Sequence, residues 1–306
     1  MKKVAVLMST YNGEKFLREQ IDSILAQKDV EVSLYIRDDM SSDGTVALLQ
    51  EYTRNNSNIH LNCGKKNLNV GNSFMKLVYS VPDSADYYAL SDQDDIWLPD
   101  KLSVAIAMLE ESGNCLYASN QENVDKDGNS MGLRYQNESI HLLPAEIVSK
   151  NMLAGCTMVF PLSFKRLLSD ENRRPSSLLL RKRIHDVWIA TVASVAGGIC
   201  YDERSFIQYR QHENNVVGSA KLTVWDDLKR KKDKLCDPSS RNGRSELAAE
   251  ITAKFGDLLP DDSLVRIMAD AAHTKKSALL RHADVLCRYT GENSVALKMK
   301  ILFGVF

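Results

Sequence analysis

Apolar runs and helix-spaced apolar residues alternate four times in the first part of this 306-residue chain. The expected strands are 4–8, 32–36, 59–63 and 87–90, and the expected helices are 14–26, 46–52, 72–81 and 100–111. The first of these segments, Val4–Met8, is continuously apolar, as in a strand that is covered on both faces. Strand and helix in this alternation predict an α/β fold, in which a mostly parallel sheet carries helices on both faces.

A polar cluster follows three of these expected strands. Thr10, Tyr11 and Asn12 come after the first strand, Asp38 and Asp39 after the second, and residues 92–95 after the fourth. Because the carboxyl ends of parallel strands meet at one edge of a sheet, where ligands bind, the clusters predict one shared cleft. The turn after the first strand has neither a GxGxxG pattern nor a P-loop lysine. The absence of the first pattern argues against a dinucleotide site, and the absence of the lysine argues against a P-loop.

The stretch Tyr87–Lys101, YYALSDQDDIWLPDK, ends a buried strand in three carboxylates, Asp92, Asp94 and Asp95. Clustered carboxylates repel one another. A divalent cation is the usual compensation, because hard cations take oxygen ligands and leave positions open for phosphate. The alternative is an acidic turn that caps the next helix, which Pro99 could open at its first position. The stretch by itself leaves both interpretations open.

The alternation loosens after residue 115, which indicates a mixed edge built onto the parallel half. Expected there are a strand at 115–118, a turn at 123–129, a turn leading into a strand at 153–160, a helix at 185–195 and two short strands within 199–210. From residue 222 the pattern is helical, with a polar linker at 237–243. The length suits one large domain with an appendage. We expect a domain at 1–220 and a helical C-terminal extension at 221–306.

The formal net charge of −1 excludes a general polyanion binder and argues against a nucleic-acid partner. The charge is uneven, since residues 221–306 contain 16 Lys and Arg against 12 Asp and Glu. No apolar run approaches the roughly 20 residues that span a bilayer, and the N-terminal run is too short for a signal peptide. Six scattered cysteines without a CxxC pair are typical of free thiols in a reducing cytosol. We therefore expect a cytoplasmic protein.

Seven short motifs follow one another along the chain. They are Ser9–Asn12, Arg37–Thr45, Asn67–Gly71, Leu90–Trp97, Leu153–Met158, His185–Trp188 and Tyr209–Asn215. In this order they resemble the motifs of family 2 glycosyltransferases, which have the Rossmann-like GT-A fold. The resemblance covers roughly residues 1–220, and residues 221–306 contain no motif of the family. The combination SDQDDIW, HDVW and YRQH most resembles the bacterial rhamnosyltransferase-type subset that builds O-antigen and capsule polysaccharide.

The resemblance implies an inverting, metal-dependent transfer of one sugar from a nucleotide-diphosphate donor, dTDP- or UDP-linked, to an acceptor hydroxyl. It assigns donor binding to Thr10, Tyr11, Asn12, Asp38, Asp39, Asn69, Asp92, Gln93 and Arg210. It assigns the cation, Mn²⁺ or Mg²⁺, to Asp94 and His212. A cation there would stabilise the charge that develops on the departing nucleoside diphosphate.

Inversion needs one base that takes the proton of the acceptor hydroxyl, and the resemblance implies Asp186. His185 stands where the family more often has Glu, and an imidazole titrates nearer neutrality, so it is a second candidate. We favour Asp186, with His185 as a helix cap or an acceptor contact. The candidate acceptor contacts are Trp97, Cys156, Thr157, His185 and Trp188.

The implied acceptor is a glycan or a lipid-linked glycan. Lipid-linked acceptors lie at an anionic membrane surface, and the extension offers the basic run 229–234 and an apolar, lysine-containing end at 295–306. We therefore expect peripheral contact of 221–306 with the inner face of the cytoplasmic membrane. The alternative for the basic run is a solvated helix face.

Two rival functions stay open. A sugar-nucleotide nucleotidyltransferase shares the α/β plan, but it needs a Gly-rich basic loop after the first strand, and Ser9–Gly13 does not supply one. A catalytically silent nucleotide-sugar-binding assembly partner is the other rival. The joint presence of Asp94, Asp186 and His212 argues against it.

Overall fold

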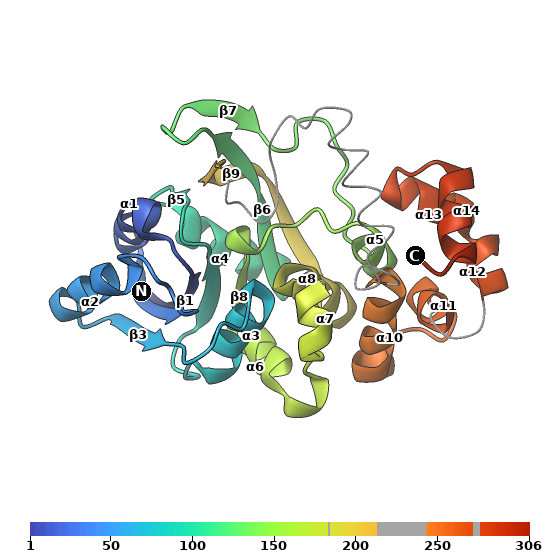
Figure 1. Ribbon diagram of the computed structural model, residues 1–306, viewed down its shortest axis with the longest axis horizontal. Helices are drawn as coiled ribbons and strands as arrows, with labels where there is room; N and C mark the ends of the chain where they lie inside the picture. Colours follow the sequence, from blue (N-terminus) through green and yellow to red (C-terminus); the bar gives the residue numbers. More distant parts are fainter. Residues whose placement is uncertain (183, 213–242, 272–275) are drawn as a thin grey trace. The chain divides into compact units, whose positions relative to one another are not determined.

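The computed structural model describes residues 1–182, 184–212, 243–271 and 276–306 (Figure 1). These residues form two compact units. The first contains residues 1–138, 153–171 and 197–212, and the second contains 139–152, 172–196 and the described part of 213–306. The two units interleave along the chain. The expected division into domains at residue 220 stays a prediction.

One sheet forms the centre of the first unit (Figure 1). Its strands are β1 (Lys2–Thr10), β2 (Val30–Asp38), β3 (Ile59–Cys63), β4 (Tyr87–Ser91), β5 (Ile96–Trp97), β6 (Leu116–Val124), β7 (Ser130–Leu133), β8 (Val159–Pro161) and β9 (Ile199–Arg210). Their order across the sheet is β3-β2-β1-β4-β8-β6-β9-β5, and β7 pairs with β6.

The parallel half of the sheet is the part that the strand–helix alternation predicts. β1 pairs in parallel with β2 and β4, and β2 pairs in parallel with β3. Val6 and Leu7 are adjacent in β1 and both are fully buried. Because successive side chains of a strand point to opposite faces, both faces of β1 are covered. This coverage explains why the apolar run is continuous.

The other half of the sheet is mixed. β8 runs antiparallel to β4 and β6, and β5 runs antiparallel to β9, whereas β6 and β9 are parallel. The prediction of two short strands within 199–210 is wrong, because β9 is one strand. Its register against β6 shifts between Ser119 and Asn120, opposite the polar residues Glu203 and Arg204. Such a bulge leaves residues unpaired and interrupts the apolar pattern without ending the strand.

The helices of the first unit connect these strands. They are α1 (Glu14–Leu25), α2 (Thr45–Asn55), α3 (Val70–Ser80), α4 (Lys101–Ser112) and α6 (Leu162–Ser169), with the 3₁₀ turn η1 (Gly155–Thr157). The four helices expected from the strand–helix alternation are α1 to α4. α1 buries Leu17, Ile21 and Ile24 at helical spacing. α4 begins at Lys101, so Pro99 does not occupy its first position.

The second unit is helical. Its elements are α5 (Pro144–Ser149), α7 (Ser177–Lys182), α8 (His185–Ala196), α10 (Gly243–Phe255), η4 (Gly256–Leu258), α11 (Leu264–Ala271), α12 (Lys276–Arg281), α13 (Ala283–Thr290) and α14 (Ser294–Leu302), and η2 (Glu171–Arg173) leads into it. α8 packs against α5 and α10. The rings of Trp188 and Phe255 lie 6.0 Å apart at this contact. Part of the helical extension therefore shares a core with the helix that carries Asp186.

No helix in the described part of the chain is long and apolar enough to cross a membrane. Five cysteines lie in that part and are free thiols: Cys63, Cys115, Cys156, Cys200 and Cys287. The basic run 229–234 and residues 237–242 of the expected linker lie outside the described residues.

Candidate active site

The carboxyl edge of the parallel strands carries the first polar cluster. Thr10 and Asp38 are register partners at the ends of β1 and β2. The Thr10 hydroxyl donates to Asp38 Oδ1 over 3.0 Å, and the Ser41 backbone N–H donates to Asp38 Oδ2 over 2.9 Å. The structure therefore brings two predicted donor-binding residues together, and their hydrogen bonds close the edge between the two strands.

Asp39 is buried one residue further along and is held by protein donors. Its carboxylate forms an ion pair with Arg37 and accepts the Leu68 backbone N–H at 2.8 and 2.9 Å. Arg37 also donates to Ser73 Oγ over 3.0 Å. These bonds tie the loop before α3 to the end of β2, so Asp39 shapes the edge. Its direct contact with a nucleoside stays a prediction.

The Tyr11 ring projects from this edge, with 51 % of the residue exposed. Gln93 fixes the backbone beneath it, because its Oε1 accepts the Tyr11 N–H at 2.8 Å and its Nε2 donates to the Tyr11 carbonyl at 3.1 Å. The next residue, Asn12, accepts the Ser42 backbone N–H at 2.8 Å. Gln93 thus positions an exposed aromatic ring on which a planar base can stack.

Asn69 precedes α3 with a left-handed φ of 61°. Asn tolerates this conformation better than most residues. Its backbone N–H donates to Asn67 Oδ1 at 2.9 Å, and its Oδ1 accepts from Asn72 Nδ2 at 3.3 Å. Asn69 therefore closes the turn into α3. Its role toward the donor stays a prediction.

The acidic loop after β4, residues 92–95, is joined to the end of β9. Asp94 Oδ2 and His212 Nε2 are 2.8 Å apart, and both side chains are largely buried. The Phe16 ring lies against His212, with the two ring centroids 5.1 Å apart. The two residues predicted to hold the metal therefore lie in direct contact.

Arg210 is buried and clamps the acidic loop from β9. Its Nε donates to the Asp94 carbonyl at 3.2 Å, and its backbone N–H donates to Asp95 Oδ1 at 3.3 Å. Its guanidinium also pairs with Glu19 and lies 4.5 Å from the centre of the Phe16 ring. These contacts give Arg210 a structural role in holding the loop. Its contact with a donor phosphate stays a prediction.

Asp95 is the fully buried member of the loop. Its Oδ2 has no hydrogen-bond partner among the described residues. Burial, together with the neighbouring carboxylates of Asp94 and Asp92, raises the pKa of Asp95 well above its usual range. The N-cap residue of α4 is Asp100, outside the loop. The interpretation of residues 92–95 as a helix cap is therefore wrong.

The oxygens of this loop fit a hard divalent cation. One ligand atom each from Asp92, Asp95 and Cys156 lies within 4.8 Å of the others. Burial raises the pKa of the Cys156 thiol, and a hard divalent cation prefers oxygen to sulfur, so the carboxylates are the ligands of this group that fit it. Crowded carboxylates and a buried oxygen without a partner are features that a cation would compensate.

Lys101 is a buried cation close to this loop. Its Nζ lies 3.5 Å from the centre of the Trp97 ring and makes no hydrogen bond with any residue that the structure describes. Burial lowers the pKa of Lys101 to about 7, although Cys156 and Asp95 act in the opposite direction. A lysine at the start of a helix is normally solvated. No signal in the sequence distinguishes this one.

The five residues expected to contact the acceptor are all buried. Trp97, Cys156, Thr157, His185 and Trp188 are at most 3 % exposed. The sequence alone gave no measure of their burial, because aromatic and small residues occur both in cores and at binding surfaces. These side chains would have to leave their packing to touch a glycan. Their burial favours packing roles.

The predicted base lies in the second unit. Asp186 is partly exposed in the first turn of α8, and its Oδ1 accepts the Val187 backbone N–H at 2.7 Å. The neighbouring His185 is buried, and burial lowers the pKa of its imidazole to about 3. A buried side chain cannot reach an acceptor hydroxyl, whereas the partly exposed Asp186 can. This difference in exposure favours Asp186 over His185, and the catalytic role of Asp186 stays a prediction.

A cleft of about 560 Å³ in the first unit is lined in part by Ile96 and Arg210, which adjoin the acidic loop. Residues from α1, from the turn between β6 and β7, and from β9 line it, among them Phe16, Lys126, Gln208 and Arg210. Its volume lies within the range of roughly 300–1,000 Å³ that is common for ligand sites. The cleft therefore gives open space next to the loop that would hold the cation.

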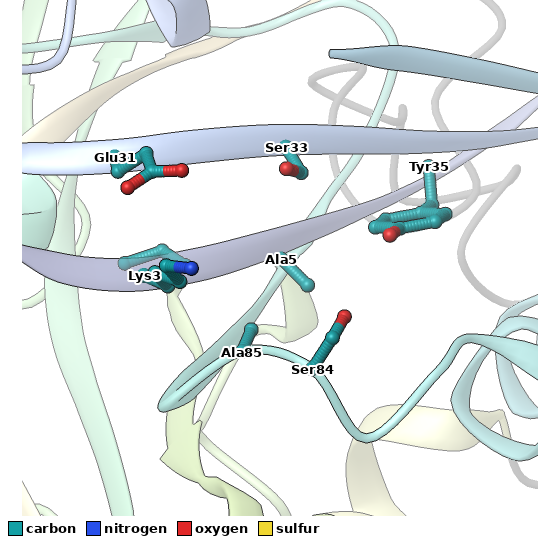
Figure 2. Close-up of a pocket in the computed structure, with 8 residues that line it drawn as sticks. Lys3, Ala5, Glu31, Ser33, Tyr35, Ser84 and Ala85 are labelled. Atoms are coloured by element: carbon teal, nitrogen blue, oxygen red, sulfur yellow. The ribbon is translucent and has the colours of Figure 1, made fainter.

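A smaller pocket of about 130 Å³ lies at the amino-terminal part of β1 and β2. Figure 2 shows Lys3 and Glu31 on these neighbouring strands, with Ser84 on the loop that precedes β4. Thr10 and Asp38 lie at the other ends of the same strands. This pocket therefore does not belong to the candidate active site.

A parallel half-sheet joined to a mixed half, with an acidic loop at the carboxyl edge, is the GT-A architecture of glycosyltransferases. Two solved structures of S. aureus TarS have the same fold. The complex with UDP has a TM-score of 0.61 at 14 % identity and covers 99 % of this chain and 86 % of that chain. The complex with UDP-GlcNAc has a TM-score of 0.55 at 18 % identity and covers 97 % and 84 %. At these identities the likeness shows the fold, and the predicted fold class is confirmed.

The sequence profile of Glycosyl transferase family 2 matches residues 5–167. The dTDP-rhamnosyl transferase RfbG of Shigella flexneri is 32 % identical over 229 residues, which cover 69 % of this chain and 74 % of that protein. The chain belongs to glycosyl transferase family 2, and it is a glycosyltransferase. TuaG of Bacillus subtilis, named for teichuronic acid biosynthesis, is 26 % identical over 159 residues, which cover 51 % of this chain and 60 % of that protein. The resemblance inferred from the seven motifs is confirmed.

Proposed function

We propose that this glycosyltransferase transfers one sugar, with inversion, from a nucleoside-diphosphate sugar to an acceptor hydroxyl of a growing bacterial surface polysaccharide. The contact between Asp94 and His212 carries the proposal. This contact joins the acidic loop to the end of β9. Both lie in the first unit, in which Tyr11 is exposed at the carboxyl edge of the parallel strands. In open α/β sheets such an edge is where nucleotides bind.

The donor is a dTDP- or UDP-linked sugar in this proposal. RfbG is named for dTDP-rhamnose, and the TarS structures contain UDP or UDP-GlcNAc. Tyr11 would stack on the base, while Thr10, Asp38 and Asp39 shape the edge around the nucleoside. Their bonded carboxylates support a rigid, preformed wall.

Asp94 and His212 would hold Mn²⁺ or Mg²⁺, and Asp92 of the same loop would contact the donor. When bound, such a cation offsets the negative charge that develops on the departing nucleoside diphosphate. Arg210 keeps these ligands in register, because it bonds the Asp94 carbonyl and the Asp95 carboxylate. Gln93 holds the adjoining Tyr11 backbone from the same loop.

Asp186 would act as the base. The acceptor oxygen attacks the anomeric carbon, the bond from that carbon to the diphosphate oxygen breaks, and the acceptor proton passes to the Asp186 carboxylate. Partial exposure supports this role, because a base must reach the acceptor hydroxyl. The burial of His185 supports the choice between the two neighbours.

The acceptor is a glycan or a lipid-linked glycan, and the name of TuaG, which mentions teichuronic acid biosynthesis, supports the surface-polysaccharide assignment. We include peripheral contact of 221–306 with the inner face of the cytoplasmic membrane in the proposal. This contact would keep the enzyme at the surface where lipid-linked glycans are extended.

A thermal-shift screen of UDP, dTDP and their sugar conjugates, with and without Mn²⁺, tests the proposal. We expect a metal-dependent rise in Tm for one nucleotide class and slow release of free sugar from its conjugate. No shift with any nucleotide would overturn the proposal. A shift without sugar release or transfer would favour the silent binding partner, and exchange of pyrophosphate into a sugar nucleotide would favour the nucleotidyltransferase.

A further inference from the structure

Helix α14 exposes a row of large apolar side chains. Val295, Met299, Leu302 and Phe303, here called the apolar row, are 70, 45, 51 and 71 % exposed. Their spacing places them on one side of the helix. On its other side, Leu297 and Ile301 are buried. α14 is therefore apolar both where it packs and where it meets solvent.

Lysines flank the apolar row. Lys298 is exposed and precedes Leu302 by four residues, so the two side chains lie on the same side of the helix. Lys276, which is also exposed, donates from Nζ to the Leu302 carbonyl at 2.9 Å. Lys300 differs from these two, because it is paired with Glu292. The row thus has cations along its side and at its end.

The segment around the row is basic. Residues 276–306 contain five Lys and Arg side chains against two Asp and Glu side chains. One of those two acids, Glu292, pairs with Arg244 as well as Lys300. The charge that remains near the apolar row is therefore positive and suits an anionic partner.

We propose that the apolar row docks on an anionic lipid surface, with Lys276 and Lys298 at the level of the head groups. Apolar side chains beside lysines on one helix side are typical of helices that lie in a membrane interface. Each lysine near such a surface adds attraction to anionic lipid. The inference rests on the membrane contact in the proposed function and names the surface that makes it.

A second copy of the chain fits this surface less well. A stable protein interface uses about 20–30 residues on each side, and the apolar row has four. In a twofold contact, Lys298 of one copy would also lie in the same interface as Lys298 of the other. Like charges in one interface repel.

Co-sedimentation of the full chain with vesicles tests the proposal. The vesicles are phosphatidylcholine alone, or phosphatidylcholine with phosphatidylglycerol. We expect binding to the second kind, and a drop of about tenfold or more in the partition coefficient for the double variant Met299→Glu, Phe303→Ser. Lys298→Gln should weaken binding to the anionic vesicles only. The matched control is Leu178→Glu, since Leu178 is 62 % exposed on α7 outside the row.

Equal binding of wild type and double variant, at equal Tm, would overturn the proposal. A dimer in solution that the double variant dissociates would also overturn it, because a second copy would then cover the row. Failure of the nucleotide screen together with intact vesicle binding would remove the proposed chemistry and leave the lipid-docking surface standing.

Discussion

His212 Nε2 lies 2.8 Å from Asp94 Oδ2, although 118 positions separate the two residues in the chain. Arg210 makes this approach possible, because it bonds both the Asp94 carbonyl and the Asp95 carboxylate from the end of β9. The fold thus brings a nitrogen and an oxygen of ligand type together. Such preorganisation reduces the cost of ordering the site when the ligand arrives.

This contact predicts how the two residues affect metal binding. We expect His212→Ala to weaken the Mn²⁺-dependent part of UDP binding by about 10–100-fold, and Asp94→Ala to abolish it. Calorimetry with and without Mn²⁺ measures both. His60→Ala is the control, because His60 stacks on Tyr35 away from the loop. A metal dependence in His212→Ala equal to that of wild type would contradict the assignment.

Asp186→Asn should separate donor binding from transfer. The amide keeps the shape of the side chain but cannot accept the acceptor proton, so transfer should fall by about 10²–10⁴-fold while UDP affinity is unchanged. Product formation measures the transfer, and calorimetry measures the affinity for UDP. Asp284→Asn is the matched control, because Asp284 occupies the first turn of α13. Wild-type turnover in Asp186→Asn would rule out its role as the base.

Gln93→Glu should disturb the Tyr11 ring. A carboxylate can still accept the Tyr11 N–H, but it cannot donate to the Tyr11 carbonyl as Gln93 Nε2 does. Loss of one such bond predicts a roughly three- to tenfold weaker affinity for UDP. Fluorescence titration with UDP measures it, and Gln50→Glu on the exposed side of α2 should behave as wild type. An unchanged affinity would mean that Gln93 does not position the ring.

His185 predicts a pH dependence of stability. Burial lowers its pKa to about 3, whereas a histidine in an unfolded chain titrates near 6.5. Between these values the unfolded chain binds a proton that the folded chain does not, so stability falls as the pH falls. From about pH 7.5 to about pH 5.5 the loss from this group is about 1 kcal/mol.

Urea unfolding at the two pH values checks this prediction. His185→Gln should show a smaller loss of stability between them than wild type, because it removes the titrating group. His60→Gln should keep the wild-type loss, since His60 is exposed on β3. Identical losses in wild type and His185→Gln would mean that the imidazole is already protonated in the folded state, or solvated.

Local pattern determined the parallel half of the sheet and the edge where the site lies. A run such as Val4–Met8 is apolar at every position because both faces of its strand are covered. In the helices that follow, apolar residues recur at the spacing of a helical turn. Parallel strands share a carboxyl edge, so the sequence by itself places the polar residues after β1, β2 and β4 at one edge. The order of the motifs then indicated the family.

Tertiary structure alone decided which of these residues are buried and which distant residues they contact. Lys101 and Trp97 lie in the interior although nothing nearby in the chain requires it, and Arg210 holds the acidic loop instead of standing open to solvent. The apolar end of the chain was visible in the sequence, but only the packing of α14 showed that the row at Val295 and Phe303 faces outward. The physical reason is that burial and long-range contacts depend on which distant segments pack together, whereas periodicity is a property of neighbours.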